Sequence, residues 1–265
     1  MSGKYVDNGT DKLIIVFQSA GRVPQEAITS YLNKEVTDEE IGRYHEKYNW
    51  FNWPKKIEEA DFYYIEDHYS GIYGWYISDF GKNIIDDIQE EIKSIVSKKN
   101  YQMVISFGSS KGGTGALIHG LLSPYIGKIF SLVPQINVTE YINKHLSMLK
   151  PLIYAENQDN INESTMNDIN NFIYPLNITR KKTIFFYTGV ADEQFKETKL
   201  FSEKIVNCGV SSTLIINVEK KKHSPMVMDN VEFIENLLKN ILSSKRTKDK
   251  NLFELEPKTF LYLGK

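Results

Sequence analysis

The sequence contains a single cysteine, Cys208, among its 265 residues. One cysteine excludes an internal disulfide framework and suits a reducing compartment. Residues 1–12 lack the apolar run of a signal peptide, and no stretch approaches the roughly 18 apolar residues that a membrane span needs. The sequence therefore predicts a cytoplasmic protein without a membrane span.

A marked excess of charge of either sign is also missing. Lys and Arg total 32 against 34 Asp and Glu, so the formal net charge is −2. Without a basic excess or a polybasic cluster, nothing indicates a nucleic-acid partner. No repeat occurs, and a content of 41% hydrophobic and 25% charged residues is typical of a globular chain. We therefore treat residues 1–265 as a single domain.

Six short apolar runs predict the strands of a mostly parallel sheet. Each run is continuous rather than alternating, as expected of strands that helices cover on both faces. The runs are residues 13–17 (LIIVF), 62–66 (FYYIE), 103–107 (MVISF), 128–133 (KIFSLV), 183–188 (TIFFYT) and 213–218 (TLIINV).

Longer amphipathic stretches lie between these runs and predict helices. They cover residues 78–98, with Ser78 or Asp79 as the N-cap, and residues 113–122, 192–207 and 227–242. Strands that alternate with helices predict an α/β protein, with helices on both faces of the sheet.

Two further stretches do not fit this alternation. Residues 137–182 are polar, rich in Asn and placed between two core strands, and their length predicts an inserted helical cap over the site. Residues 243–265 form a tail, in which 243–250 read as a solvated linker and 252–263 could add an edge strand.

The central candidate for chemistry is Ser110, in the middle of residues 108–112 (GSSKG), which match G-x-S-x-G. In this motif the serine occupies a sharp turn from strand to helix, and small residues on either side let the two approach. The new helix presents free N–H groups, so the amide of Lys111 is a candidate oxyanion donor. A glycine-rich phosphate loop is the alternative, but GSSKGGTG lacks the Walker spacing. We predict Ser110 as a nucleophile.

An acid and a histidine are expected further along the chain, in that order. Asp192 follows the strand at 183–188, at the end of the sheet where the nucleophile should lie. His223 follows the next strand in a loop before a helix, although a surface histidine in a basic loop would give the same pattern. Glu193 is the alternative acid and could instead begin a helix. The predicted triad is Ser110, Asp192 and His223.

The other four histidines are weaker candidates. His119 falls within the helix after Ser110 and is expected to be packed, whereas His45 and His145 fall in amphipathic stretches and are expected to be solvated. His68 follows a strand end and could line the pocket.

The loop after the first run supplies a second candidate oxyanion donor, the amide of Ser19 or Ala20. A tight turn alone would explain the same small residues. The adjacent Gln18 is a candidate for substrate binding.

Residues 62–76 (FYYIEDHYSGIYGWY) are dense in Tyr and Trp. Amphipathic rings suit a sugar or an acyl thioester, which makes Tyr73 and Trp75, together with His68, candidates for substrate binding. Packing of the rings in the core explains the same density equally well.

Four segments, FGSSKGGTGAL, EDHYSGIYGWY, TGVADEQF and KKHSPM, resemble bacterial polysaccharide O-acetyltransferases with an α/β-hydrolase fold. These include enzymes that modify capsules and enzymes of accessory secretion systems that acetylate adhesin glycans. The resemblance spans residues 10–245. It implies that fold, the triad Ser110, Asp192 and His223, acetyl-coenzyme A as co-substrate, and a polysaccharide hydroxyl as acceptor.

Two other functions remain open at this point. An esterase or deacetylase would use the same triad with water as acceptor, and a glycan-binding or assembly component would keep the triad without using it. We expect no bound cofactor and no metal. The sequence leaves open the acceptor glycan and the oligomeric state.

The side chain of Lys111 has two interpretations. Its ammonium group could attract the phosphates of coenzyme A or an anionic capsule, or it could pair with Glu66 or Asp67 and shape the loop.

Overall fold

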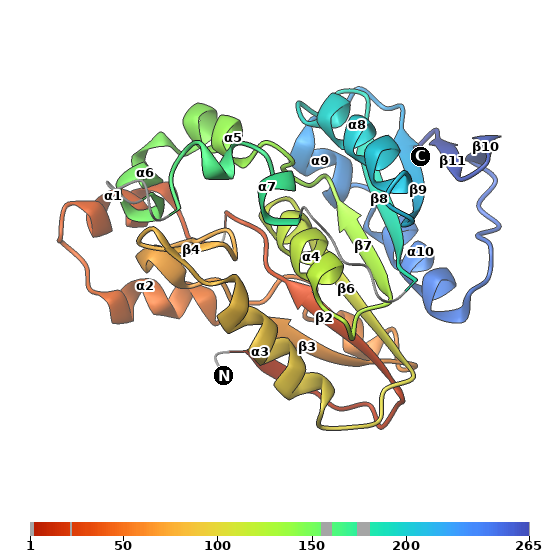
Figure 1. The fold of residues 1–265 in the computed structure, drawn as a ribbon, viewed down its shortest axis with the longest axis horizontal. Coiled ribbons are helices and arrows are strands. Elements are labelled where there is room, and N and C mark those ends of the chain that lie inside the picture. Colours follow the sequence, from red (N-terminus) through yellow and green to blue (C-terminus); the bar gives the residue numbers. More distant parts are fainter. Residues whose placement is uncertain (1–2, 22, 155–160, 174–180, 265) are drawn as a thin grey trace.

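A nine-stranded sheet runs through a computed structural model that describes residues 3–21, 23–154, 161–173 and 181–264 (Figure 1). The strand order is β1-β3-β2-β6-β7-β8-β9-β11-β10. Strands from β3 to β11 in this order pair in parallel, and β1 and β10 pair antiparallel at the two edges. The strands are β1 (Lys4–Val6), β2 (Lys12–Phe17), β3 (Asp61–Ile65), β6 (Met103–Ser109), β7 (Lys128–Leu132), β8 (Thr183–Gly189), β9 (Ser211–Asn217), β10 (Leu252–Glu256) and β11 (Thr259–Tyr262).

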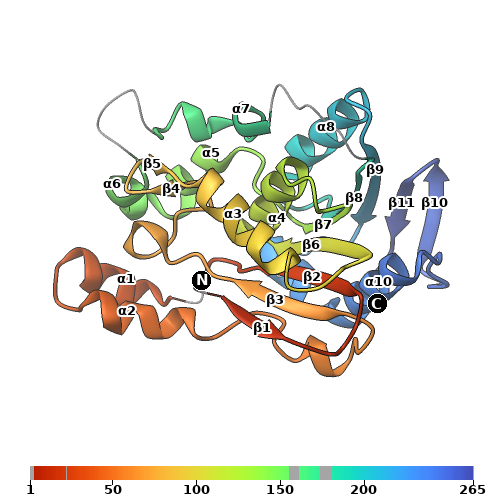
Figure 2. The ribbon, with the colours of Figure 1, turned by 60° about the horizontal axis from the view of Figure 1, so that its bottom comes forward.

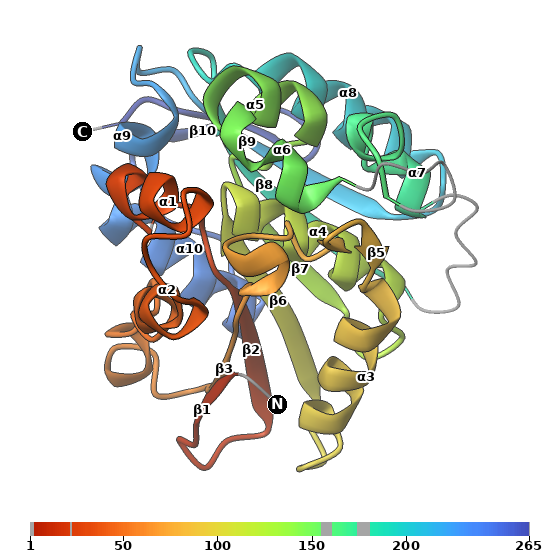
Figure 3. The ribbon, with the colours of Figure 1, turned by 90° about the vertical axis from the view of Figure 1, so that its left-hand side faces the viewer.

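Helices cover both faces of this sheet. In Figure 3, α3 and α4 lie on one side of the sheet and α10 on the other. The helices are α1 (Gln25–Leu32), α2 (Asp38–His45), α3 (Ile85–Val96), α4 (Lys111–Leu122), α5 (Val138–His145), α6 (Lys150–Ile153), α7 (Asn170–Ile173), α8 (Phe195–Val206), α9 (His223–Met228) and α10 (Val231–Ser243), with short 3-10 turns at η1 (Trp53–Lys55), η2 (Tyr69–Gly71), η3 (Ser147–Leu149) and η4 (Thr165–Asn167).

The strand β2 shows how the two faces are buried. Its side chains alternate, so Leu13, Ile15 and Phe17 join the core under α3, α4 and α8, and Ile14 and Val16 join the core under α10. All five are fully buried. A strand with both faces buried has no polar face, which explains the continuous apolar run in the sequence.

The predicted class, a mostly parallel sheet with helices on both faces, is confirmed. All six predicted strands occur, with ends that differ by at most two residues. No helix among the described residues is long and apolar enough to cross a membrane.

Three of the predicted helices have the wrong start. Residues 78–84 are not helical, because Phe80 and Gly81 both have positive φ and close a hairpin between β4 (Ser78–Asp79) and β5 (Lys82–Asn83). Helix α3 therefore starts only at Ile85. Helix α4 starts two residues earlier than predicted, at Lys111.

The later helices differ in a similar way. Helix α8 starts at Phe195 rather than 192, since Asp192 accepts the backbone N–H of Gln194 in a turn before it. The predicted helix 227–242 is split between α9 and α10. Asn230 lies at the break and donates from its side chain to the carbonyl of Met226 at 2.9 Å.

The predicted cap contains α5, η3, α6, η4 and α7, which lie together above the sheet (Figure 2). Residues 155–160 and 174–180 of that stretch lie outside the described residues, and its status as an insertion stays a prediction. The tail was predicted to add an edge strand, and it adds two strands that form a hairpin. β11 pairs with β9, and β10 pairs with β11 and is the edge strand.

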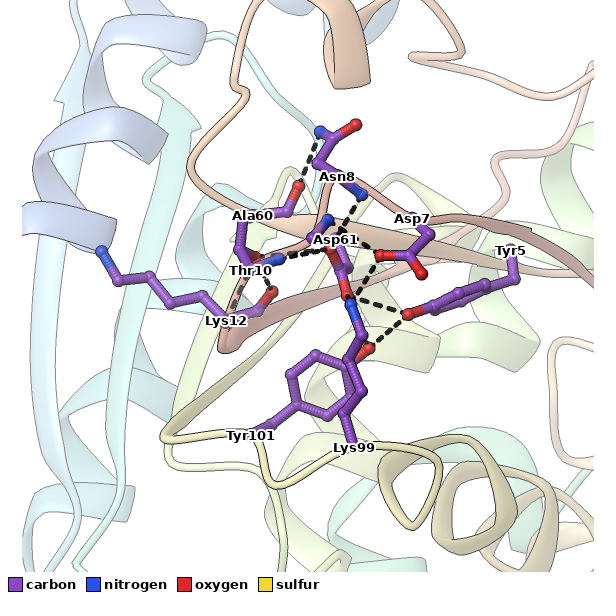
Figure 4. Close-up of polar contacts among 10 residues, drawn as sticks. Tyr5, Asp7, Asn8, Thr10, Lys12, Ala60, Asp61, Lys99 and Tyr101 are labelled. Carbon is purple, nitrogen blue, oxygen red and sulfur yellow. Dashed lines mark hydrogen bonds and ion pairs between the residues drawn. The ribbon is translucent and has the colours of Figure 1, made fainter.

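Asp61 is a buried carboxylate that bonds to several residues near the first strands (Figure 4). It lies at the start of β3, whereas Ser110 follows the end of the parallel strand β6. Asp61, the first residue of β3, is fully buried and accepts hydrogen bonds from the hydroxyls of Tyr5 and Tyr101, both at 2.8 Å. It also accepts from Lys99 Nζ at 2.7 Å and from the backbone N–H of Thr10 at 3.1 Å. Burial alone would raise the pKa of Asp61, but these donors together hold the pKa well below its ordinary value.

We expect Asp61→Asn to lower the free energy of unfolding by about 2 kcal/mol, because the charge-assisted bonds are lost and buried donors face a weaker acceptor. Urea unfolding measures the change. Glu39→Gln is the control, since the Arg43–Glu39 pair is exposed and should contribute less than about 1 kcal/mol.

The pH dependence of stability in the wild-type and Asp61→Asn proteins tests the role of this charge. The folded-state pKa of Asp61 is lowered, so its contribution is fully present above the ordinary aspartate pKa of about 4 and is lost as the pH falls below that value. The difference between wild type and Asp61→Asn should therefore shrink between about pH 4 and pH 2. A constant difference would show that Asp61 acts through its shape and not its charge.

Candidate active site

Ser110 lies at the turn between β6 and α4. Its backbone has φ 58° and ψ −124°, a conformation that costs a non-glycine residue about 1–3 kcal/mol. A Cβ on Gly108 would lie 2.2 Å from the carbonyl oxygen of Gly112, and a Cβ on Gly112 would lie 2.2 Å from that of Phe17. Both positions therefore require glycine, which is why strand and helix can pack this closely around the serine.

Two hydrogen bonds join Ser110, His223 and Asp192. His223 Nε2 lies 2.8 Å from Ser110 Oγ, and His223 Nδ1 lies 2.6 Å from Asp192 Oδ2. A carboxylate can only accept, so a neutral His223 carries its proton on Nδ1 and leaves Nε2 to accept from the serine hydroxyl. The three residues predicted as a triad thus have the geometry of a serine-histidine-aspartate relay.

The sheet explains why these side chains meet. Ser110 follows β6, Asp192 follows β8 and His223 follows β9, and these strands end at the same edge with only β7 between β6 and β8. His223 is the first residue of α9, rather than part of a loop before a helix.

Glu193, the alternative acid, has partners other than His223. It pairs with Lys144 and with His145, whose Nε2 is 2.6 Å from Glu193 Oε1. Burial would raise the pKa of Glu193, but both partners hold the pKa below its ordinary value. The structure therefore places Asp192 and not Glu193 against His223.

Gln135, which follows β7, was missed by the sequence analysis. Its Nε2 donates to Ser110 Oγ at 2.7 Å, and the residue is fully buried. Its backbone N–H and carbonyl oxygen both bond to the hydroxyl of Thr114, at 2.9 Å each. Ser110 Oγ accepts the hydrogen bond from Gln135 Nε2, which cannot itself accept the serine proton. The serine hydroxyl is therefore left to donate to His223 Nε2. No motif marks this glutamine.

Tyr141 of α5 is a second missed residue. Its ring centroid lies 5.9 Å from that of His223. Burial raises the pKa of Tyr141, and Tyr141 lines the cavity together with Ser110. The predicted cap therefore contributes a side chain at the triad.

The predicted oxyanion donors differ in their present partners. Lys111 is the first residue of α4, so its backbone N–H lies at the N-terminus of the helix that follows Ser110. The amide of Ser19 donates to Asn49 Oδ1 at 3.1 Å, so it is already committed. This leaves Ala20 as the candidate for the second donor, and its role stays a prediction.

The side chain of Lys111 is fully buried. Its Nζ lies 2.6 Å from Asp67 Oδ2, which is buried too, and 4.5 Å from the ring centroid of Tyr76. The hypothesis that this ammonium attracts phosphate is wrong. Of the two acids considered, Asp67 is its partner, while Glu66 accepts from the hydroxyl of Tyr48.

The four residues predicted to bind substrate do not line the cavity at Ser110. Gln18 is fully buried, and its side chain bonds to the carbonyl of Val16 and the N–H of Asn49. Tyr73 and Trp75 are at most 1% exposed and belong to the core.

His68 also lies outside the cavity at Ser110. It stacks on Tyr69 and lies 3.8 Å from Glu66, in a separate pocket. Packing, the alternative interpretation, thus accounts for most of the aromatic segment at 62–76.

The remaining histidines were partly misjudged. His119 is packed as predicted: it is fully buried, bonds to the carbonyl of Tyr76 at 2.9 Å, and burial lowers its pKa to about 4. His145 is exposed, as predicted. His45 was expected to be solvated but is 2% exposed, because its face of α2 packs edge-on against Tyr73.

A cavity of about 670 Å³ opens beside Ser110 and His223. One wall comes from residues 48–53 (YNWFNW), a second from α5 and a third from α9 and α10. The lining residues are Ser19, Ala20, Gly21, Tyr48, Asn49, Trp50, Phe51, Asn52, Trp53, Lys56, Ser109, Ser110, Val133, Tyr141, His145, Leu146, His223, Ser224, Val227, Met228 and Val231. The described residues contain no cluster of three or more His, Cys, Asp or Glu that could hold a metal ion.

The parallel sheet, the strained serine turn and the order serine, aspartate, histidine define the α/β-hydrolase fold. No protein-family model and no curated protein matches the sequence. Solved structures do match. The capsule O-acetyltransferase of Neisseria meningitidis serogroup A aligns with a TM-score of 0.60 at 19% identity, over 91% of this chain and 92% of that one.

Two hydrolases align over similar lengths. The fluorophosphonate-binding serine hydrolase F of Staphylococcus aureus gives a TM-score of 0.54 at 12% identity, over 89% of this chain and 83% of that one. Acetyl xylan esterase 1 of a Thermoanaerobacterium species gives 0.52 at 14% identity, over 91% and 78%. At these identities the matches establish the fold.

Proposed function

We propose that this chain is a serine-dependent O-acetyltransferase, which moves acetyl from acetyl-coenzyme A to a hydroxyl of a bacterial capsular or cell-surface polysaccharide. The relay from Ser110 through His223 to Asp192, with its distances of 2.8 and 2.6 Å, is the observation that carries the proposal. The likeness to the meningococcal capsule O-acetyltransferase supports acetyl transfer. A cavity of about 670 Å³ has the size of a small-molecule site.

In the first half-reaction, Ser110 Oγ attacks the carbonyl carbon of the thioester while His223 Nε2 takes the serine proton. Asp192 keeps the imidazole oriented and stabilises the imidazolium that forms. The amides of Lys111 and Ala20 are our candidates for stabilising the oxyanion. The carbon–sulfur bond then breaks, coenzyme A leaves as a thiol with the proton from His223, and Ser110 carries the acetyl group.

In the second half-reaction, a sugar hydroxyl attacks the acetyl-serine and gives its proton to His223. The bond between Ser110 Oγ and the acetyl carbon breaks, and the serine recovers its proton. Water competes for the same intermediate, so a transferase must hold its acceptor hydroxyl in line with the ester. Tyr141 and Leu146 line the cavity from α5 and the residue after it, and we expect these side chains to limit the approach of water.

The second candidate is an esterase or deacetylase with water as acceptor. The likeness to acetyl xylan esterase 1 favours it, and the triad would serve both reactions equally. A component without catalysis is a poorer explanation, because a non-catalytic protein has no use for a strained serine hydrogen-bonded to His223.

Incubation with acetyl-labelled coenzyme A separates these functions. We expect label in an added bacterial polysaccharide and little in free acetate, whereas the esterase alternative predicts acetate regardless of the polysaccharide. Label in neither product with the wild-type protein would contradict the transferase, and release of acetate from 4-nitrophenyl acetate or an acetylated polysaccharide then tests the esterase. The Ser110→Ala protein gives the background rate.

Gln135 provides a further test of the relay. Gln135→Met keeps the length of the side chain but removes the donor to Ser110 Oγ, so we expect kcat to fall about 10- to 100-fold with little change in KM. Steady-state kinetics with 4-nitrophenyl acetate measure both. An unchanged kcat would mean that the 2.7 Å contact has no part in the reaction.

A further inference from the structure

Residues 48–53 (YNWFNW) join α2 to η1 and form one wall of the cavity beside Ser110. Four of the six residues are aromatic. Tyr48 and Trp50 are half-buried, and Phe51 is 39% exposed, which is unusual in a chain whose other aromatic-rich segment is buried in the core.

Buried residues under the cavity wall hold this segment in place through ring packing and a hydrogen bond. Trp53 is 2% exposed and packs at 5.0 Å from the ring centroid of Phe107, while the ring of Trp50 lies 4.6 Å from that of Trp53. The hydroxyl of Tyr64 donates to the carbonyl of Trp50 at 3.1 Å. These contacts fix the ring of Trp50. The ring of Phe51 packs edge-on against Tyr64 at 5.3 Å, and Lys4 Nζ lies 4.6 Å from its centroid, so the ring keeps only part of its surface for a ligand.

The segment is also joined to the loop with the candidate oxyanion donors. The backbone N–H of Asn49 donates to Gln18 Oε1 at 2.7 Å, and Asn49 Oδ1 accepts the N–H of Ser19 at 3.1 Å. A molecule lying on the aromatic wall would thus be held at a fixed position relative to Ser110.

Trp50 has a φ of 62°. For a bulky residue this conformation is a genuine outlier and costs about 1–3 kcal/mol. Such strain persists where the surroundings fix it, and it clusters at binding and catalytic sites. Here it turns the chain so that Trp50 and Phe51 both border the cavity.

The charge of the cavity restricts what could lie there. Among its described lining residues are Lys56 and two histidines, but no Asp or Glu. Lys56 pairs with Glu235 at 3.1 Å, and Glu235 is shared with Lys239 at 2.9 Å, so this group keeps a net positive charge. The two histidines are themselves paired with carboxylates, Asp192 and Glu193, which do not line the cavity. A cationic ligand would therefore meet no acidic side chain among the described lining residues.

We propose that residues 48–53 are the platform for the acceptor, on which a hexose ring of a neutral or anionic glycan stacks. The C–H face of a hexose packs against aromatic rings, while its hydroxyls need polar partners, which Asn49 and Asn52 supply at the same wall. The inference rests on the proposed function, because the platform positions the hydroxyl that Ser110 would acetylate.

The test is binding of fluorescently labelled Ser110→Ala protein to an array of neutral, anionic and cationic hexose oligosaccharides. The Ser110→Ala background prevents turnover on the array. Phe51→Ala in this background should weaken binding to the neutral or anionic sugars at least fivefold. Phe253→Ala, which removes a 48% exposed phenylalanine on β10, should leave it unchanged. The urea midpoint of each variant confirms that it is folded.

Two results would overturn the platform. One is binding to none of the sugars or to cationic sugars alone, and the other is binding that Phe51→Ala and Phe253→Ala affect equally. The proposed function fails separately, if the wild-type protein turns over neither acetyl-coenzyme A nor 4-nitrophenyl acetate. An inactive wild-type protein that still binds glycans through Phe51 would keep the platform and reject the acetyltransferase.

Discussion

Ser110→Ala should lower the turnover of acetyl-coenzyme A at least about a thousandfold and leave the free energy of unfolding nearly unchanged. The loss is large because Ser110 Oγ is the atom that forms the acyl bond, with His223 Nε2 at 2.8 Å ready to take its proton. The fold is spared because alanine meets the same backbone strain as serine at φ 58°.

Acetyl-transfer kinetics and urea unfolding measure the two quantities. A fluorophosphonate should label the wild-type protein at Ser110 and leave Ser110→Ala unlabelled. Ser97→Ala, on an exposed serine after α3, is the control and should behave like wild type. If Ser110→Ala keeps even a tenth of the wild-type rate, Ser110 is not the nucleophile.

Asp192→Asn should lower kcat about 10³- to 10⁴-fold, whereas Glu193→Gln should change it less than about tenfold. An amide at residue 192 can donate to His223 Nδ1, which moves the imidazole proton to Nε2 and removes the acceptor for the serine hydroxyl. It also removes the charge that stabilises the imidazolium. Glu193 instead pairs with Lys144 and His145.

Kinetics of both variants on acetyl-coenzyme A and on 4-nitrophenyl acetate make this comparison. The Asp192→Asn loss should appear with both substrates, because each acylates Ser110 through the same proton transfer to His223. Equal losses in the two variants, or a larger loss for Glu193→Gln, would reverse the assignment of the acid.

The sequence predicted the parts of the molecule that strong local constraints determine. Gly108 and Gly112 are required by contacts of 2.2 Å, so a short pattern marks Ser110. Asp192 and His223 follow continuous apolar strands, and parallel strands bring such positions together at one edge.

The side chains that line the cavity were not predictable in the same way. Tyr73 and Trp75 are of the residue types that bind sugars, but both lie in the core. Phe51 belongs to a segment that has no motif, and yet it borders the cavity. Gln135 reaches Ser110 because Thr114 fixes its backbone, a contact between α4 and the loop after β7 that no local pattern records. These positions depend on tertiary packing between segments distant in sequence.

Rapid-quench mass spectrometry tests the central claim most directly. Wild-type protein is mixed with acetyl-coenzyme A, quenched within the first turnover and digested, and the peptide that contains Ser110 is analysed. We predict one acetyl group on Ser110, formed together with one equivalent of free coenzyme A and before any acetylated polysaccharide, and removed when a polysaccharide acceptor is added. A protein that turns over acetyl-coenzyme A but carries no acetyl group on Ser110 at any time would contradict the account.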